Sequence, residues 1–85
     1  MARLKYQIIF SPEAYEDFRA SKAYHRASVR DAINQHLSYE PARLIKSRIK
    51  QLREMIKPQY RLRVGDIRVF YDVRKAIVEV TAIVD

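Results

Sequence analysis

The sequence predicts an α+β fold: an N-terminal strand, two helices, and then an antiparallel sheet with the helices packed on one face. Three observations lead to this expectation. An alternating apolar stretch lies near the N-terminus, two segments with helical spacing follow it, and the last third of the chain alternates again around short turns. A chain of 85 residues is expected to form a single domain, residues 1–85.

The first strand is predicted in LKYQIIF, residues 4–10. Its alternating apolar residues are Leu4, Tyr6, Ile8 and Phe10. A period of two is typical of a strand with one buried face. This strand should therefore place one row of side chains in the core.

The first helix is predicted to begin after Ser11, which is a favourable N-cap, with Pro12 at the first helical position. The acidic residues Glu13, Glu16 and Asp17 favour the N-terminal end of the helix dipole. Its buried side is expected to contain Ala14, Tyr15 and Phe18.

A second helix is predicted from about His25 to Leu37. Helical spacing is shown by Val29, Ala32, Ile33, His36 and Leu37. Pro41 is expected to end this helix, because a residue before proline, here Glu40, is pushed toward extended geometry.

The segment LIKSRIKQLREMIK, residues 44–57, has two interpretations. Helical spacing of Ile45, Ile49, Leu52 and Ile56 favours an amphipathic helix, for which a solvated polar face is favoured over docking on a partner or a membrane surface. The position just before a hairpin leaves room for a short strand around Arg48 to Leu52 instead. Pro58 ends the segment in either case.

A hairpin is predicted around Gly65–Asp66, because a two-residue loop that begins with glycine suits a type II′ turn. This turn sets Val64 opposite Ile67, and Arg63 opposite Arg68. One face is then apolar: Tyr60, Leu62, Val64, Ile67, Val69, Tyr71 and Val73. The other face contains Arg61, Arg63, Arg68, Phe70 and Asp72.

The last strand, AIVEVTAIV, is a nearly continuous apolar run and is predicted to be central in the sheet. A two-residue turn at Arg74–Lys75 would pair Val73 with Ala76. The core face would then gain Val78, Val80, Ala82 and Val84. The opposite face would gain Ile77, Glu79, Thr81 and Ile83.

The chain is strongly basic, with 17 lysines and arginines against 10 acids and a formal charge of +7. This balance favours a polyanion partner, either nucleic acid or an acidic protein segment, over a merely solubilising surface. There is no cysteine, no signal-peptide pattern and no apolar run of ~20 residues. We therefore expect a cytoplasmic protein that needs no membrane.

The hairpin arginines need a counter-charge, because Arg63 is expected opposite Arg68 with Arg61 on the same face, and opposed like charges are unfavourable. Solvent, or the acids Asp72 and Glu79, could supply the compensation. A phosphate held by the guanidinium groups is favoured, because three cations outnumber two acids. The two histidines lack companions for a metal site, and no metal or cofactor is expected.

The stretch YRLRVGDIRVFYDV, followed by AIVEVTAIV, resembles the C-terminal half of the RelE/ParE superfamily of toxins from type II toxin–antitoxin modules. The specific part is the pattern Y-R-x-R-x-G-D-x-R-x-x-Y, residues 60–71. The predicted order of elements also resembles that family over essentially the whole chain. The resemblance favours a strand rather than a helix near Ile49 to Leu52.

The resemblance implies one of two targets and a protein partner. RelE-type members cut mRNA in the ribosomal A site, ParE-type members poison DNA gyrase, and a small antitoxin wraps and neutralises either type. For RelE-type cutting, the resemblance implies that Arg61 and Arg68 are the catalytic contacts to the scissile phosphate. Lys50 is implied as a further contact, and Arg63, the second arginine of the motif, is either a phosphate contact or structural. From its place on the same face, Phe70 is expected to be able to contact a base of the RNA.

The sequence also departs from the RelE pattern. It ends in AIVD at Asp85, without the basic and aromatic groups that the resemblance leads us to expect after the last strand. Arg61 cannot readily act as a general base, because a guanidinium stays protonated. Nearby residues that could replace it in proton transfer are Lys50, Tyr71 and Glu79, although a structural role is favoured for each of them. A non-catalytic binding protein and a gyrase inhibitor therefore stay open beside the endoribonuclease.

Overall fold

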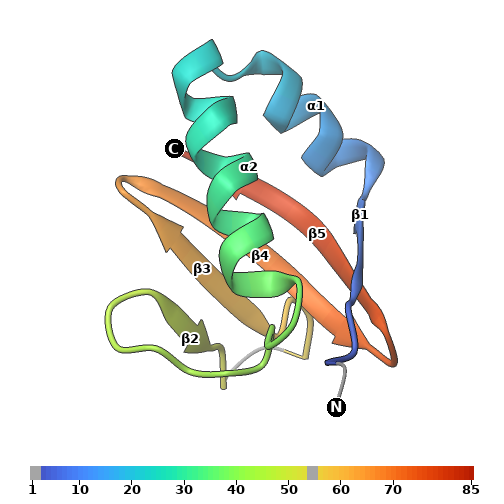
Figure 1. Ribbon diagram of the computed structural model, residues 1–85. Helices are drawn as coiled ribbons and strands as arrows, with labels where there is room; N and C mark the ends of the chain where they lie inside the picture. Colours follow the sequence, from blue (N-terminus) through green and yellow to red (C-terminus); the bar gives the residue numbers. More distant parts are fainter. Residues whose placement is uncertain (1–2, 54–55) are drawn as a thin grey trace.

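The described part of the chain forms a five-stranded sheet with two helices over one of its faces (Figure 1). The computed structural model describes residues 3–53 and 56–85. In chain order the elements are β1 (Gln7–Phe10), α1 (Pro12–Ala20), α2 (Ala23–Leu37), β2 (Ile49–Gln51), β3 (Tyr60–Val64), β4 (Ile67–Arg74) and β5 (Ile77–Val84). The predicted α+β class is confirmed.

The sheet is mixed rather than wholly antiparallel. Its strand order is β1-β5-β4-β3-β2, and β1 runs parallel to β5 while the other neighbours are antiparallel. A parallel pair needs a long connection between its strands, and the helices with the hairpin provide one. The last strand has a neighbour on both sides, so its predicted central position is confirmed.

Strand β1 is shorter than predicted, because it begins at Gln7 and not at Leu4. The backbone N–H of Tyr6 donates to the carbonyl of Ser38 at 2.7 Å, so the chain before Gln7 is held by the loop after α2. Leu4 is 60% exposed, against the prediction. Three of the four predicted residues, Tyr6, Ile8 and Phe10, do pack against the core.

The predicted start of α1 is confirmed. Ser11 caps the helix, with its Oγ accepting from the N–H of Ala14 at 3.1 Å, and Pro12 occupies the first turn. Ala14 is fully buried and Phe18 packs against the core. Tyr15 was expected on the buried side, which is wrong: its side chain is 53% exposed, at the rim of a groove between the helices and β1.

Helix α2 begins two residues before the predicted start and ends at Leu37, as predicted. Its buried residues are Val29, Ala32, Ile33 and Leu37. His36, the fifth residue of the predicted stripe, is only half-buried. Pro41 lies beyond the end of α2, and its carbonyl accepts a hydrogen bond from Tyr71.

The ambiguous segment contains a short strand, so the helical interpretation is wrong. Ile49 of β2 is buried and pairs with Leu62, and the N–H of Arg63 donates to the carbonyl of Arg48 at 2.7 Å. Tertiary pairing with β3 thus overrides the helical spacing, which Ile45 and Ile56 helped to create. Ile56 is 90% exposed, whereas residues 54–55 of this segment lie outside the described residues.

The hairpin of β3 and β4 has the predicted register. Tyr60 pairs with Tyr71, Leu62 with Val69, and Arg63 with Arg68. Gly65 has a φ of +60°, which is the left-handed backbone that the first position of a type II′ turn requires. The two predicted faces of this hairpin are therefore confirmed.

The second turn differs from the prediction. It lies at Lys75–Ala76, with φ +55° at Lys75, and pairs Val73 with Val78 instead of Ala76. A register shift between Phe70 and Tyr71 then changes the facing of the rest of β5.

This β-bulge decides which residues of β5 enter the core, because an extra residue moves all later side chains to the other face. Val78 and Val80 are fully buried, as predicted. Beyond the bulge Ile83 is buried, whereas Val84 is 42% exposed. The predictions for Ala82, Val84 and Ile83 are therefore wrong.

Candidate nucleic-acid interface

The face of the sheet opposite the helices carries the predicted cationic residues. We call it the open face, and its site residues are Lys50, Arg61, Arg63, Arg68 and Phe70. Lys50 of β2 pairs with Arg61 of β3, which pairs in turn with Phe70 of β4. Because alternate residues of a strand point to opposite faces, these side chains lie opposite the buried Leu62 and Val69. The sheet therefore brings all five predicted site residues to one surface.

Three arginines surround a hollow of about 310 Å³, which we call the arginine hollow. It is lined by Arg61, Arg63, Gly65, Asp66 and Arg68. The Nε of Arg63 donates to the carbonyl of Gly65 at 3.1 Å, which holds this guanidinium beside the β3–β4 turn. The hollow thus combines fixed N–H donors with open access, as a phosphate ligand would need.

Arg61 has an unused hydrogen-bond donor. Its Nε is buried and has no hydrogen-bond partner among the residues that the structure describes. A buried donor without a partner costs about 1–3 kcal/mol. Such a group is explained if an anion supplies the missing acceptor.

The two acids of this face do not neutralise the arginines. Asp72 is buried, and its Oδ1 accepts from the N–H of Gln59 at 2.8 Å, while Oε1 of Gln59 accepts from the N–H of Val73. Asp72 therefore joins the start of β3 to β4. Glu79 pairs with Asp72 across the sheet. Within residues 3–53 and 56–85, no ion pair within 4.0 Å joins the three hollow arginines to an acid.

Tyr71 is a structural residue and does not face the hollow. It is fully buried on the helix side, its hydroxyl donates to the carbonyl of Pro41 at 2.7 Å, and its ring stacks on Tyr60. Burial, and then the neighbouring Tyr60, raise the pKa of Tyr71 above its ordinary value. Its hydroxyl therefore keeps its proton and cannot serve as a base on the open face.

The two histidines, His25 and His36, lie in different surroundings. Burial and the charge of Arg48 lower the pKa of His36. Nδ1 of His25 lies 4.0 Å from Oδ2 of Asp85. In the described part of the chain, no group of three or more potential ligands could hold a metal ion. No helix of that part is long and apolar enough to cross a membrane.

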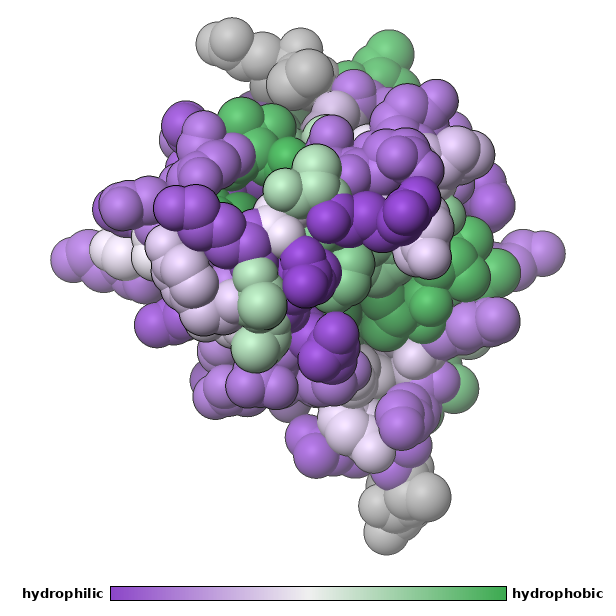
Figure 2. Space-filling view, turned by 90° about the horizontal axis from the view of Figure 1, so that it is seen from above, coloured by the Kyte–Doolittle hydropathy of each residue, from purple (hydrophilic) through white to green (hydrophobic). Residues whose placement is uncertain are grey.

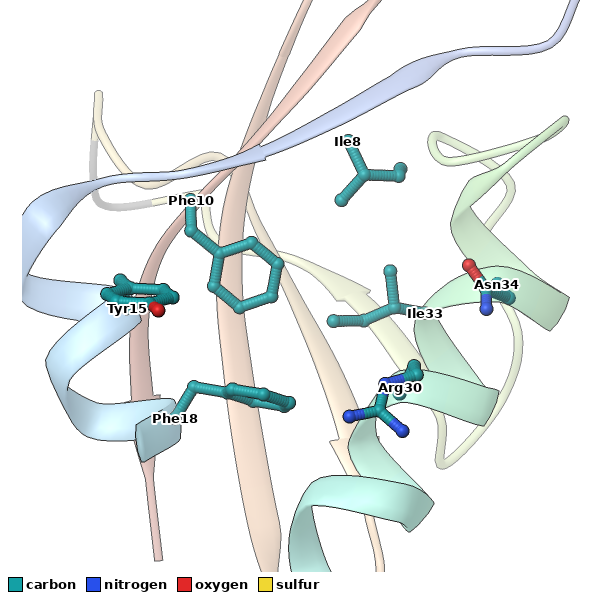
Figure 3. Close-up of a pocket in the computed structure, with 7 residues that line it drawn as sticks. All are labelled: Ile8, Phe10, Tyr15, Phe18, Arg30, Ile33 and Asn34. Atoms are coloured by element: carbon teal, nitrogen blue, oxygen red, sulfur yellow. The ribbon is translucent and has the colours of Figure 1, made fainter. Parts of the chain in front are cut away.

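Two surface features were not indicated by the sequence. One is an apolar groove of about 280 Å³ between β1 and the helices, lined by Ile8, Phe10, Tyr15, Phe18, Arg30, Ile33 and Asn34 (Figure 3). Figure 2 shows exposed hydrophobic areas among the hydrophilic residues of the surface. The other is a cleft beside the β3–β4 turn. Each unites residues from distant segments, so no local pattern indicated it.

The fold and the open face define a small α+β protein whose basic sheet surface is left uncovered by its helices. The sequence matches no protein-family model and no curated protein sequence. The structure is similar to the crystal structure of an archaeal RelE–RelB complex from Pyrococcus horikoshii, with a TM-score of 0.76 and 20% sequence identity. The match covers 94% of this chain and 93% of that chain. The RelE-like fold predicted from the hairpin motif is therefore confirmed.

Proposed function

We propose that the protein is the toxin of a type II toxin–antitoxin module and cuts mRNA on the ribosome. The observation that carries this proposal is the arginine hollow, in which Arg61, Arg63 and Arg68 lack acidic partners among the described residues. The RelE-like fold supports it, because the resemblance to that family implies this activity. An enzyme acting on the ribosome would work in the cytoplasm.

In the proposed reaction, Arg61 and Arg68 bind the scissile phosphate. The ribose 2′-oxygen attacks the adjacent phosphorus, a new O2′–P bond forms, and the P–O5′ bond breaks. The 2′-hydroxyl loses its proton to water, and the departing 5′-oxygen gains one from water. Because negative charge grows on the phosphoryl oxygens during attack, fixed guanidinium groups stabilise the transition state more than the ground state.

The other open-face residues position the RNA. Arg63, fixed at the turn through Gly65, and Lys50, at the sheet edge, are assigned neighbouring phosphates. Phe70 is half-buried beside Arg61 and is assigned a contact with a ribose or base. Phosphate contacts hold the strand in register without reading its sequence.

The proposed partner is a cognate antitoxin. The similar structure is that of a complex of RelE with RelB. This chain has a formal charge of +7, which favours a partner with acidic segments. We propose that such a partner neutralises the toxin.

Induced expression in bacteria tests the proposal, with growth and mRNA 5′ ends followed over time. Wild type should arrest growth and create new mRNA ends. Arg61→Ala/Arg68→Ala should lower cleavage at least about 100-fold, the usual effect of removing a preorganised charge from a transition state. The matched control is Arg19→Ala/Arg43→Ala, which removes the same charge from two exposed arginines that pair with Glu16 and Glu40.

The outcomes separate the candidate functions. Cleavage that survives in Arg61→Ala/Arg68→Ala, or is lost equally in the control, would contradict the assigned site. Growth arrest with intact mRNA would favour gyrase as the target. Normal growth with wild type would leave a protein that binds without catalysis.

A further inference from the structure

A second depression lies beside the arginine hollow, between the first turn of α2 and the β3–β4 turn. We call it the turn cleft. It has a volume of about 550 Å³, and its lining includes Lys22, Tyr24, His25, Asp66 and Asp85. It shares Gly65 and Asp66 with the arginine hollow, so the two depressions meet at the β3–β4 turn. Figure 1 shows this turn, the C-terminus and the start of α2 at the same end of the molecule.

An exposed aromatic ring stands in the turn cleft. Tyr24 is 62% exposed, and its ring meets the ring of His25 edge-on, with 4.2 Å between centroids. His25 is half-buried and lies against Asp85 through the 4.0 Å contact of its Nδ1. Tyr24 is therefore supported by one neighbouring ring, and much of its surface is free. Free aromatic rings beside a phosphate site are the platforms on which single-stranded RNA stacks its bases.

The charged residues that line the cleft are one cation, Lys22, and two acids. Asp66 and Asp85 both line the cleft, and an ionised carboxylate only accepts hydrogen bonds. Guanine presents two adjacent donors, its N1–H and its amino group, to a carboxylate, and its O6 and N7 acceptors to the ammonium of Lys22. Uracil presents a single N–H between two carbonyl oxygens, which a carboxylate repels. A base held here should therefore be guanine in preference to uracil.

We propose that the turn cleft binds the base of a nucleotide whose neighbouring phosphate lies in the arginine hollow, with the base stacked on Tyr24 and guanine preferred. The proposal rests on the proposed function, because it needs RNA in the arginine hollow. In this proposal, the residues on the helix side of the β3–β4 turn determine which base is preferred. The residues of the open face are assigned contacts to the RNA but no preference for one base.

The test uses two short RNAs, UUGUU and UUUUU, with 2′-O-methyl groups that block cleavage. Each is titrated into ¹⁵N-labelled protein, and the amide resonances report both affinity and location. Wild type should bind UUGUU at least about fivefold more tightly than UUUUU, since guanine offers a carboxylate two donors where uracil offers one, and a hydrogen bond to a charged group contributes roughly that factor or more. The UUGUU titration should shift Gly65, Tyr24 and His25, whereas UUUUU should mainly shift the arginine hollow.

Matched variants locate the preference. Tyr24→Ala should remove the fivefold difference, while Tyr24→Phe keeps the ring and should preserve it. Tyr15→Ala removes a tyrosine of similar exposure from the apolar groove and should also preserve it. Dispersed amide spectra of the free variants establish that each is folded.

The remaining outcomes distinguish two failures. Equal binding of both RNAs, unchanged in Tyr24→Ala but weakened in Arg61→Ala/Arg68→Ala, would overturn the base site and leave the proposed function standing. Absence of binding by either RNA to wild type at millimolar concentration would overturn the base site, whereas the proposed function is overturned only by the expression test above.

Discussion

The two faces of one sheet contrast sharply in this protein. On the helix side, Leu62, Val69 and Tyr71 are fully buried. On the open face, their sequence neighbours Arg61, Arg63 and Arg68 surround a hollow that is open to solvent. The same strands thus place stabilising residues and the proposed phosphate-binding residues at alternate positions. Adjacent substitutions on β3 should therefore have opposite consequences for stability.

Residues of the open face lower the free energy of unfolding, whereas residues on the helix side raise it. Arg63 lies directly across from Arg68, and like charges in this position are unfavourable. Arg61 adds a buried Nε without a partner among the described residues. Costs of this kind are typical of binding sites, where function limits stability.

The largest effect is expected for Leu62→Ala. Leu62 is 0% exposed, and its truncation leaves a cavity between β3 and α2, with a loss of about 3 kcal/mol in the free energy of unfolding. Urea denaturation followed by circular dichroism measures this loss. A change below about 1 kcal/mol would mean that the helix side is not a packed core.

A smaller, pH-dependent effect is expected for Tyr71→Phe. The variant leaves the buried carbonyl of Pro41 without its donor, which should cost about 1–2 kcal/mol at pH 7. Because burial raises the pKa of Tyr71 in the folded state, its stabilising contribution is present below about pH 10 and lost as the pH rises further.

The difference in unfolding free energy between wild type and Tyr71→Phe should therefore shrink from pH 7 to pH 11. Urea titrations at both pH values measure it. A difference that grows with pH would contradict the assigned burial of this hydroxyl.

The smallest effect, of opposite sign, is expected for Arg61→Met. Methionine keeps much of the aliphatic stem and removes the unpartnered Nε, so the free energy of unfolding should rise by about 1 kcal/mol while RNA binding weakens. Denaturation and RNA titration of the same sample measure the two changes. A loss of stability would indicate that Nε has an acceptor within the protein.

The sequence predicted some parts of this architecture well, for physical reasons. Gly65 accepts a positive φ, so the turn type, the register of β3 and β4, and the grouping of Arg61, Arg63 and Arg68 could all be inferred. The turn at Lys75 places a non-glycine residue at positive φ, which no sequence rule indicated. The β-bulge in the pairing of β4 with β5 has no signature in the apolar sequence of β5. Which face of the sheet Ile83 occupies could therefore not be inferred.

The candidate site was predicted only where its residues are neighbours along strands. The turn cleft unites Tyr24 with Asp66 and Asp85, which are distant in the sequence and meet only through the packing of α2. The structural role of Asp72 could not be inferred either. Its Oδ1 accepts a hydrogen bond from the N–H of Gln59, and this contact depends on the conformation of the loop before β3. Tertiary contacts, not local pattern, determine both.

The most direct test of the central claim, that the arginine hollow holds the scissile phosphate, is cleavage in a purified system. Programmed ribosomes with a defined codon in the A site would be mixed with wild type or Arg61→Ala/Arg68→Ala, and mRNA cleavage rates measured. We expect cleavage in the A-site codon by wild type and a rate at least about 100-fold lower for the variant. Equal rates for the two proteins would contradict it.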